Sequence, residues 1–127
     1  MTDSMKDSIL NSVKEDIGIS PEYTDFDKQL IRDINTALMI VYQLGYGDSE
    51  FKISSADDSW TDFAKLYTGK NSIDEIKTYV SNRVRQLFDP AGITSSMNNA
   101  INEQNRELEW RINAKYDRTG AASEEDE

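Results

Sequence analysis

Apolar residues recur at intervals of three and four along five stretches of the chain, and the glycines and prolines fall between these stretches. This spacing places apolar side chains on one face of an α-helix, whereas glycine and proline interrupt helices. The pattern therefore predicts an all-α protein, a small bundle of four to five helices with a long C-terminal helix. The predicted helices span residues 4–16, 25–44, 59–67, 73–88 and 95–116.

The second stretch predicts the central helix of the bundle. Its apolar face consists of Phe26, Leu30, Ile34, Ala37, Leu38 and Val41. Residues 37–42 are apolar nearly all round, which is typical of a helix buried by neighbouring helices or by another subunit. Thr24 or Asp25 is suited to cap the first turn, and Gly45 is suited to the left-handed conformation that follows a helix end.

The flanking helices have narrower apolar stripes and clear boundary signals. The stripes of the first and third helices are Met5, Ile9, Val13 and Ile17, and Trp60, Phe63, Ala64 and Tyr67. Ser72 and Glu75 have the spacing of a capping box at the start of the fourth helix, and Pro90 ends that helix. Residues 51–53 alternate and are compatible with a short β segment, which would need a partner strand from a neighbouring subunit.

The last helix has the least apolar surface for its length. Its stripe is interrupted in the middle by Gln104 and Asn105 and consists of Met97, Ile101, Leu108 and Ile112. A helix with so thin a stripe is weakly stable alone, so we expect it to pack on another chain or to project. Four consecutive acidic residues end the chain and predict a disordered tail over residues 118–127, which leaves one helical domain over residues 1–117.

The composition narrows the classes of function. A chain of 127 residues forms one domain and is long enough to bury a core. Its formal net charge of −10 disfavours sequence-specific DNA recognition, although screening by salt lets a local basic face touch phosphates. The absence of cysteine and histidine excludes disulfides, thiolate nucleophiles and Cys/His zinc sites. No apolar run approaches the roughly 20 residues of a membrane-spanning helix.

No stretch carries a complete catalytic, metal-binding or phosphate-binding motif. Residues 45–50 begin like a phosphate-binding loop but lack its lysine. Asp57, Asp58 and Asp62 do not have the spacing of a calcium loop, and Asp58 or Ser59 is better explained as a helix cap. No acid lies in the apolar setting that raises the pKa of a catalytic carboxyl group. The sequence thus predicts neither an enzyme nor a bound cofactor or metal.

Basic residues along the fourth helix are a first candidate interaction surface. Arg83 and Arg85, with Lys77, form a basic flank, and Phe88 ends the apolar stripe beside it. The flank has two explanations. It either contacts nucleic acid phosphates or pairs with the many acids of this chain or of a neighbouring subunit.

The Glu109-Trp110-Arg111 segment of the last helix is a second candidate. Trp110 lies off the apolar stripe, because two residues of a helix separate side chains by about 200°. Tryptophan and arginine are enriched at interface hot spots, which predicts that Trp110 packs on a neighbouring copy or a partner protein. The alternative is that Trp110 folds back under the first helix as part of the core.

Taken in order, several short segments resemble the small head–tail connector (adaptor, or head-completion) proteins of long-tailed bacteriophages. The resemblance covers about residues 9–112. It rests on Asp16-Ile17-Gly18-Ile19, on Asp27, Leu30, Ile31, Ile34 and Asn35 running into Gln43-Leu44-Gly45, on Trp60-Thr61-Asp62-Phe63, on Leu87-Phe88-Asp89-Pro90, and on Glu109-Trp110-Arg111. Many relatives carry a second proline where this chain has Ala91, which loosens the turn but leaves the helix stop intact.

This resemblance implies a structural virion protein that works at the head–tail interface and is made in the host cytoplasm. Its partners would be the portal protein, other copies of itself in a ring of about a dozen, and the next connector or a tail protein. DNA would pass through the ring without sequence-specific binding, and we expect acidic residues to line that channel. The family has no catalytic motif, so no catalytic residue is implied.

Two other functions fit a small acidic chain. A protein that mimics DNA would array acids along one face, but here acids alternate with lysines and arginines in most predicted helices. A tail-assembly chaperone would bind an extended partner transiently and would be missing from the finished particle.

Overall fold

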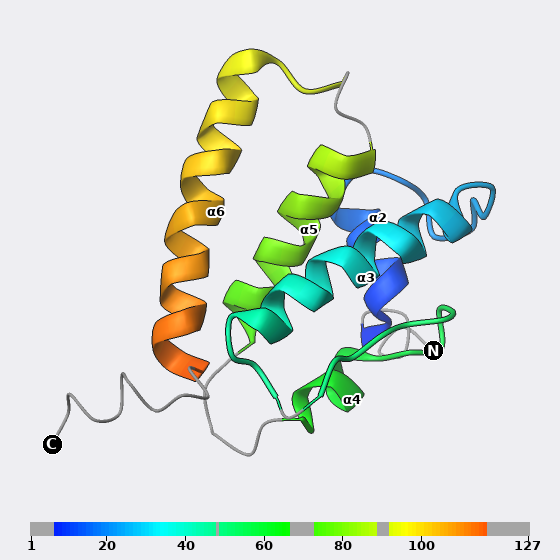
Figure 1. Ribbon diagram of the computed structural model, residues 1–127. Helices are drawn as coiled ribbons and strands as arrows, with labels where there is room; N and C mark the ends of the chain where they lie inside the picture. The colour runs from blue at the N-terminus through cyan, green and yellow to red at the C-terminus, as the bar shows by residue number, and fades with distance from the viewer. Residues whose placement is uncertain (1–6, 48, 67–72, 89–91, 117–127) are drawn as a thin grey trace, which may run out of the picture.

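The computed structural model describes residues 7–47, 49–66, 73–88 and 92–116, and Figure 1 shows the chain as a bundle of helices. The helices are α2 (Ile9–Asp16), α3 (Asp27–Gln43), α4 (Trp60–Ala64), α5 (Asp74–Phe88) and α6 (Ser95–Tyr116). The described residues form no β-strand, and their only strand-like pairing is an isolated bridge between Ser8 and Ser59. The prediction of an all-α bundle with a long C-terminal helix is confirmed.

Helix α5 lies in the middle of the bundle, with α3 against one side and α6 along another (Figure 1). The short helix α2 packs on both α3 and α5. Buried apolar side chains from all five helices and from the loops form one core. It comprises Ile9, Leu10, Val13, Leu30, Ile34, Ala37, Leu38, Val41, Tyr46, Ile53, Trp60, Phe63, Ile76, Tyr79, Val80, Val84, Leu108, Ile112 and Tyr116.

The predicted central helix is confirmed in position, but it begins later than expected. Its first residue is Asp27 and its N-cap is Phe26, which provides no side-chain cap. The carbonyl of Thr24 instead accepts a hydrogen bond from the Asp27 N–H at 3.2 Å, so the predicted cap residues belong to a turn before the helix. Gly45 has a φ of +123°, as its place after the helix end predicted.

The short helices are set by serine caps. The Ser8 hydroxyl accepts a hydrogen bond from the Asn11 N–H, and the Ser59 hydroxyl accepts one from the Asp62 N–H. Helix α4 is shorter than predicted, because Lys65 and Leu66 bond in tighter turns to Asp62 and Phe63. The predicted roles of Met5, Tyr67, Ser72 and Pro90, and the acidic tail, lie outside the described residues.

The predicted β segment over residues 51–53 does not form. The side chain of Asn35 on α3 takes the place of a partner strand, because its Oδ1 accepts from the Ile53 N–H at 2.8 Å and its Nδ2 donates to the Ile53 carbonyl at 3.0 Å. Ile53 is buried in the core as a result, and Lys52 stays exposed. The alternation of residues 51–53 therefore reflects a loop fixed to α3.

The buried lysine of α2 was not expected from the sequence. Lys14 is 1% exposed, and its Nζ donates to Asp27 Oδ1 at 2.8 Å and to the Pro21 carbonyl at 3.0 Å. This ion pair joins α2 to the start of α3 and fixes the loop between them. None of the helices in the described ranges is both long enough and apolar enough to cross a membrane.

Candidate interaction surfaces

Helix α6 is attached to α5 along its N-terminal half by side-chain amides. Gln86 donates to Asn98 and Asn102 and accepts from Asn105, while Asn82 donates to Asn105. In these four hydrogen bonds the amide nitrogen lies 2.8 to 3.1 Å from the accepting amide oxygen. Asn105, which interrupts the apolar stripe, is buried for this reason, whereas Met97 from the predicted stripe is 41% exposed. We call this set of contacts the amide seam.

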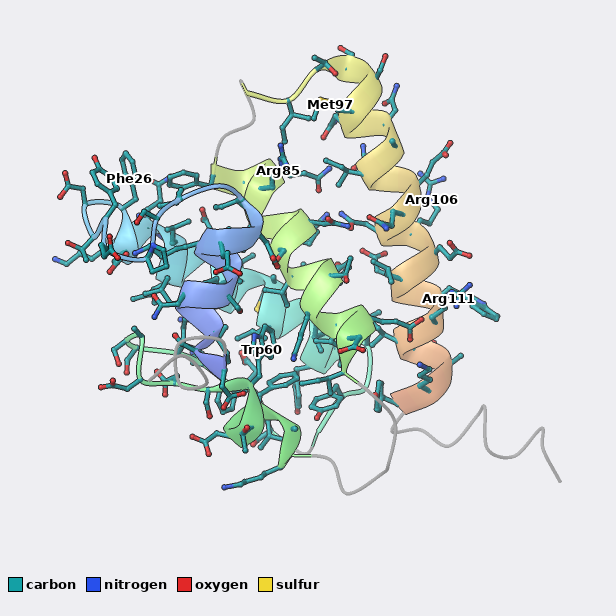
Figure 2. The ribbon with its side chains drawn as sticks, turned by 180° about the vertical axis from the view of Figure 1, so that it is seen from behind. Phe26, Trp60, Arg85, Met97, Arg106 and Arg111 are labelled. Carbon is teal, nitrogen blue, oxygen red and sulfur yellow. The ribbon has the colours of Figure 1, made fainter. Side chains whose placement is uncertain are left out.

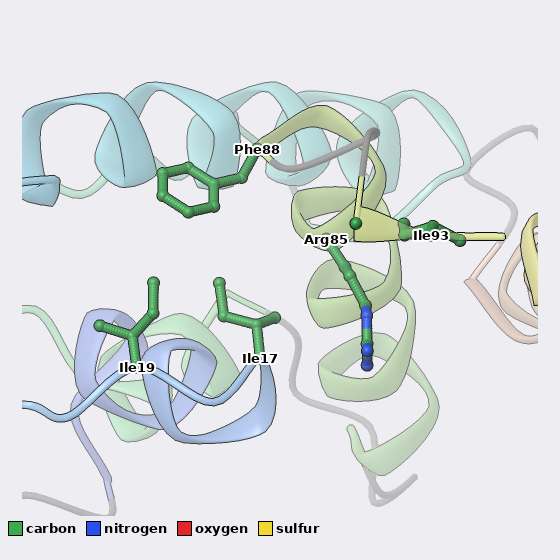
Figure 3. Close-up of a pocket in the computed structure, with 6 residues that line it drawn as sticks. Ile17, Ile19, Arg85, Phe88 and Ile93 are labelled. Atoms are coloured by element: carbon green, nitrogen blue, oxygen red, sulfur yellow. The ribbon is translucent and has the colours of Figure 1, made fainter.

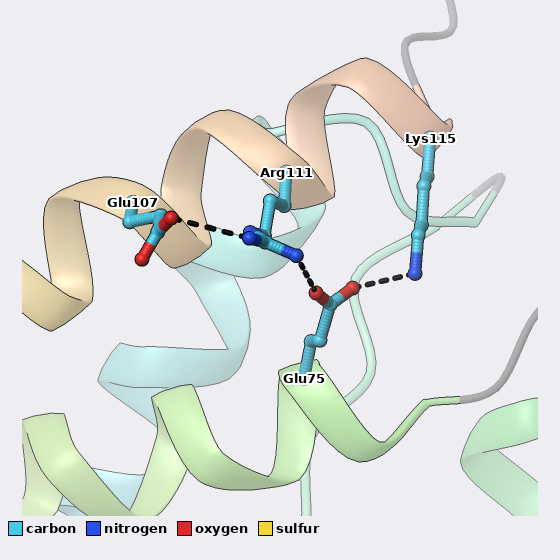
Figure 4. A network of polar contacts seen from close by, with 4 residues as sticks. All are labelled: Glu75, Glu107, Arg111 and Lys115. Carbon is cyan, nitrogen blue, oxygen red and sulfur yellow. Dashed lines mark hydrogen bonds and ion pairs between the residues drawn. The ribbon is translucent and has the colours of Figure 1, made fainter.

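The C-terminal half of α6 is held by apolar contacts and by charges. Leu108, Ile112 and Tyr116 are buried. Figure 4 shows Glu75 of α5 between two cations of α6, with Arg111 at 3.4 Å and Lys115 at 2.5 Å. The hydrogen bond from Lys115 is the main cause that lowers the pKa of the Glu75 carboxyl group. Because both halves of α6 are anchored on α5 of the same chain, the prediction that this helix projects or packs on another chain is wrong.

The three residues of the Glu109-Trp110-Arg111 segment point in different directions. Glu109 accepts a hydrogen bond from the buried Tyr79 hydroxyl at 2.7 Å, and Arg111 pairs with Glu75 and with Glu107. Both residues therefore stabilise the contact between α5 and α6 within one chain. Burial and the Glu109 carboxylate together raise the pKa of Tyr79. Arg111 reaches from α6 to Glu75 of α5, as the dashed line in Figure 4 shows.

Trp110 is exposed over 72% of its side chain, the largest value among the large apolar residues of the described chain. The alternative that it folds under the first helix as core is wrong. By contrast, the other tryptophan, Trp60, is buried and donates a hydrogen bond from its indole to Ser12 at 2.8 Å. An exposed tryptophan on a well-anchored helix is a surface that a partner can cover without refolding the chain.

The basic flank of α5 does not pair with acids of its own chain within the described residues. Lys77 lies 5.8 Å from the centroid of the Trp60 ring, and the Nε of half-buried Arg83 has no hydrogen-bond partner there. Arg85 is exposed and lines a pocket of about 130 Å³ with Phe88, where Ile17 points toward the phenyl ring (Figure 3). Contact with a neighbouring subunit or with DNA phosphates stays a prediction for Arg85.

Phe88 belongs to an aromatic edge that sequence reasoning did not identify. The ring of Phe26 packs against Phe88 at 5.2 Å between centroids and against Tyr23 at 5.4 Å. Tyr23 and Phe26 are exposed over 46% and 42% of their side chains, and Leu87 nearby in sequence over 43%. Phe26 fitted the apolar face of the central helix, so its spacing predicted burial. As the cap residue of α3 it lies at the edge of the bundle instead, as its label in Figure 2 shows.

A protein-family comparison decides the class of the chain. The family described as phage connector protein matches residues 9–119. The chain belongs to this phage connector family. No curated protein and no solved structure gives a match.

Family membership makes this connector a structural protein of phage particles that assembles with other virion proteins.

The chemistry of the described surface is consistent with this structural role. Within the described residues, no three acidic side chains come together in a way that could hold a metal ion. Two of the aspartates that lie close together in the sequence have other partners: Asp58 accepts hydrogen bonds from the Ser54 and Ser55 N–H groups, and Asp62 pairs with Lys65. Among the described residues, the exposed Trp110, Arg85 with its pocket and the aromatic edge are features that a connector could use.

Proposed function

We propose that the protein is a head–tail connector that forms a ring of about twelve copies beneath the portal of the phage head. The ring extends the DNA channel and presents a surface to the next connector or to a tail protein. The protein reaches this position from the host cytoplasm, where the particle is assembled. The single observation that carries the proposal is the exposed Trp110 on a member of the phage connector family.

A ring closes through head-to-tail contacts, so each subunit needs two different complementary faces. The chain has distinct apolar faces of this kind. Trp110 lies on α6, and the aromatic edge of Tyr23, Phe26 and Phe88 lies at the beginning of α3 and the end of α5. Figure 2 shows α6 and Phe26 at opposite margins of the molecule. Their separation supports contacts with two neighbours, or with one neighbour and the portal.

The charge of the chain supports a channel through which DNA slides. A net charge of −10 on a protein that surrounds DNA keeps the polyanion from adhering, because like charges repel within a Debye length of about 8 Å at physiological salt. DNA then passes without sequence-specific binding. Arg85, exposed and without an ion pair in the described residues, is the basic group that would contact the portal or a passing phosphate.

The test adds the purified protein to DNA-filled, tail-less capsids that lack it and images the portal vertex by electron microscopy. We expect a ring of extra density under the portal. Trp110→Ala should remove the ring, because the loss of a tryptophan that acts as an interface hot spot costs about 2 kcal/mol of binding or more. Met97→Ala is the matched control, since Met97 is also exposed and lies on the same helix.

The outcome separates the connector from the alternatives. Density under the portal with wild type and with Met97→Ala, but not with Trp110→Ala, is the expected result. If the wild-type protein leaves the vertex unchanged and is also absent from finished virions, the connector proposal fails. In that case a tail-assembly chaperone or a protein that binds a host partner becomes the better explanation.

A further inference from the structure

The outer side of α3 carries an open groove of about 450 Å³ that the family match does not explain. Ile31 and Met39 supply its apolar surface, and Met39 is 39% exposed. The groove also contains charged and polar side chains from α3 and from the loop that follows it. These are Lys28, Arg32, Asn35, Thr36, Glu50 and Lys52. We call these eight residues the α3 groove.

The shape of the α3 groove is fixed before anything binds. Asn35 forms two hydrogen bonds to the backbone of Ile53, and they hold the loop carrying Lys52 against α3. Ile53 is buried beneath, at 3% exposure. A surface with a fixed shape loses little conformational entropy when it binds a partner, which favours a rigid occupant such as a helix.

The charged side chains of the α3 groove form no ion pair among the described residues, although Arg32 lowers the pKa of its neighbour Asp33 against the larger effect of burial. Lys28, Arg32 and Lys52 take part in none of the ion pairs formed among the described residues, and neither does Glu50. Three cations and one carboxylate around an apolar floor are unusual on a chain with a net charge of −10. A partner complementary to these charges presents an apolar side chain for the floor, acidic residues for the three cations and one cation for the carboxylate.

The outer face of α6 has this composition. Glu103, Arg106, Glu107 and Trp110 follow one another at helical spacing, so they share one face. Glu103 and Arg106 are exposed and make no ion pair within the described residues. Glu107 is 64% exposed beside its partner Arg111. We call these four residues the α6 ridge.

We infer that the α3 groove of one copy receives the α6 ridge of a second copy, with Trp110 between Ile31 and Met39. Acids of the ridge then face Lys28, Arg32 and Lys52, and Arg106 faces Glu50. The indole gains contact with the methionine sulfur and with a guanidinium or ammonium group over its ring. This inference rests on the proposed ring and deepens it, because it names the two faces that meet.

The positions of the two surfaces fit a head-to-tail contact. In Figure 1, α6 forms one margin of the molecule, and the first turns of α3 lie toward the opposite margin. Helix α5 lies between them and packs on both. The two surfaces therefore do not overlap, and each copy can use its ridge and its groove at the same time. Repetition of such a contact gives a ring when the rotation between copies closes.

The test uses engineered cysteines, which is direct because the natural chain has none. Ala114→Cys places a thiol one turn beyond Trp110, and Thr36→Cys places one in the α3 groove without removing the apolar or charged side chains that the contact uses. The two proteins are mixed at millimolar concentration with a short bismaleimide, a reagent that joins two thiols. We expect the mixture to give a cross-linked pair in which one chain of each variant is joined to the other. The matched control mixes Ala114→Cys with Thr61→Cys, because Thr61 lies exposed on α4 and outside the proposed contact.

Charge reversal sharpens the test of the same contact. Glu103→Lys or Arg32→Glu should each reduce the yield of cross-linked pair at least several-fold, and the two reversed chains together should recover most of it. Equal cross-linking of the Thr61 control, or chains that remain monomeric at millimolar concentration, overturns the inference whether or not the protein binds capsids. A chain that forms the pair but leaves the portal vertex empty refutes the proposed function alone.

Discussion

The two sides of α5 are built from different chemistry. On the α3 side, the contact consists of fully buried aliphatic side chains such as Ile34, Leu38, Val80 and Val84. On the α6 side, the N-terminal half of the contact is the amide seam, and the C-terminal half adds ion pairs to a few buried apolar residues. Buried apolar area stabilises at about 25 cal/mol per Å², whereas an exchanged hydrogen bond contributes about 1 kcal/mol.

The difference teaches which contact holds the fold and which one sets geometry. Aliphatic packing between α3 and α5 supplies most of the stability, but it does not require one particular orientation of the two helices. The amides between α5 and α6 supply little stability, yet each donor must meet its acceptor, so they fix the rotation of α6 about its axis. That rotation is what turns Trp110 outward and Glu109 toward the Tyr79 hydroxyl of α5.

The largest expected effect is on the α3 side. Ile34→Ala should lower the free energy of unfolding by about 2–5 kcal/mol, because Ile34 is fully buried and its loss leaves a cavity. Denaturant unfolding followed by circular dichroism measures this change. Ile31→Ala is the control on the same helix, since Ile31 is only half-buried, and its effect should be clearly smaller. Equal losses from the two variants would contradict the comparison.

The sequence predicted the apolar side of this comparison well. Five of the six residues predicted for the apolar face of the central helix are buried. Apolar residues spaced three and four apart lie on one side of a helix, and that side packs against the core. Phe26 is the exception, since it caps the helix where the bundle ends. The exposure of Trp110 agrees with its angle to the stripe and decides between the two alternatives that the sequence left open.

The polar side was harder to predict, although a signal exists in the chain. Gln104 and Asn105 interrupt the apolar stripe in the sequence, and amides are usually exposed, so the sequence predicts no buried contact for them. Yet Asn98, Asn102 and Asn105 have the same helical spacing as a stripe, and Asn82 and Gln86 repeat it on α5. Lys14 gave no such signal, because its partners Asp27 and Pro21 come together only after the loop between α2 and α3 has folded.

A smaller effect is expected in the amide seam. Asn105→Ala removes a hydrogen bond to Gln86 and one from Asn82 at a site that is 3% exposed, which should cost about 1–2 kcal/mol. Hydrogen exchange locates the loss. The amides of α6 should exchange faster while those of α3 keep their protection, because α6 opens before the rest of the chain.

The control for the seam is Asn102→Ala, which removes a single hydrogen bond that Asn102 accepts from Gln86 at an exposed position and should have less effect. If Asn105→Ala instead accelerates exchange in α3 and α6 equally, the two sides of α5 unfold as one unit. The proposed division between a contact for stability and a contact for geometry would then be wrong.

The smallest effect is expected at Glu75, where it depends on pH. The folded protein lowers the pKa of this carboxyl group below its ordinary value of 4.5, mainly through the hydrogen bond from Lys115. A lowered pKa in the folded state means that the unfolded chain binds the proton more tightly. The stabilisation by Glu75 is therefore complete at neutral pH and is lost as the pH falls through the lowered folded pKa.

Glu75→Gln should consequently reduce stability at pH 7 by less than about 1 kcal/mol, because both ion pairs are partly exposed and screened by water. The difference in melting temperature between the variant and the wild type should shrink as the pH falls below 4.5 and close in stronger acid. Glu107→Gln is the matched control, since Glu107 is 64% exposed and its ion pair among the described residues is with Arg111. A Glu75 effect that stayed constant down to strong acid would mean that packing, and not charge, joins this end of α6 to α5, and the contrast between the two sides of α5 would be confined to the amide seam.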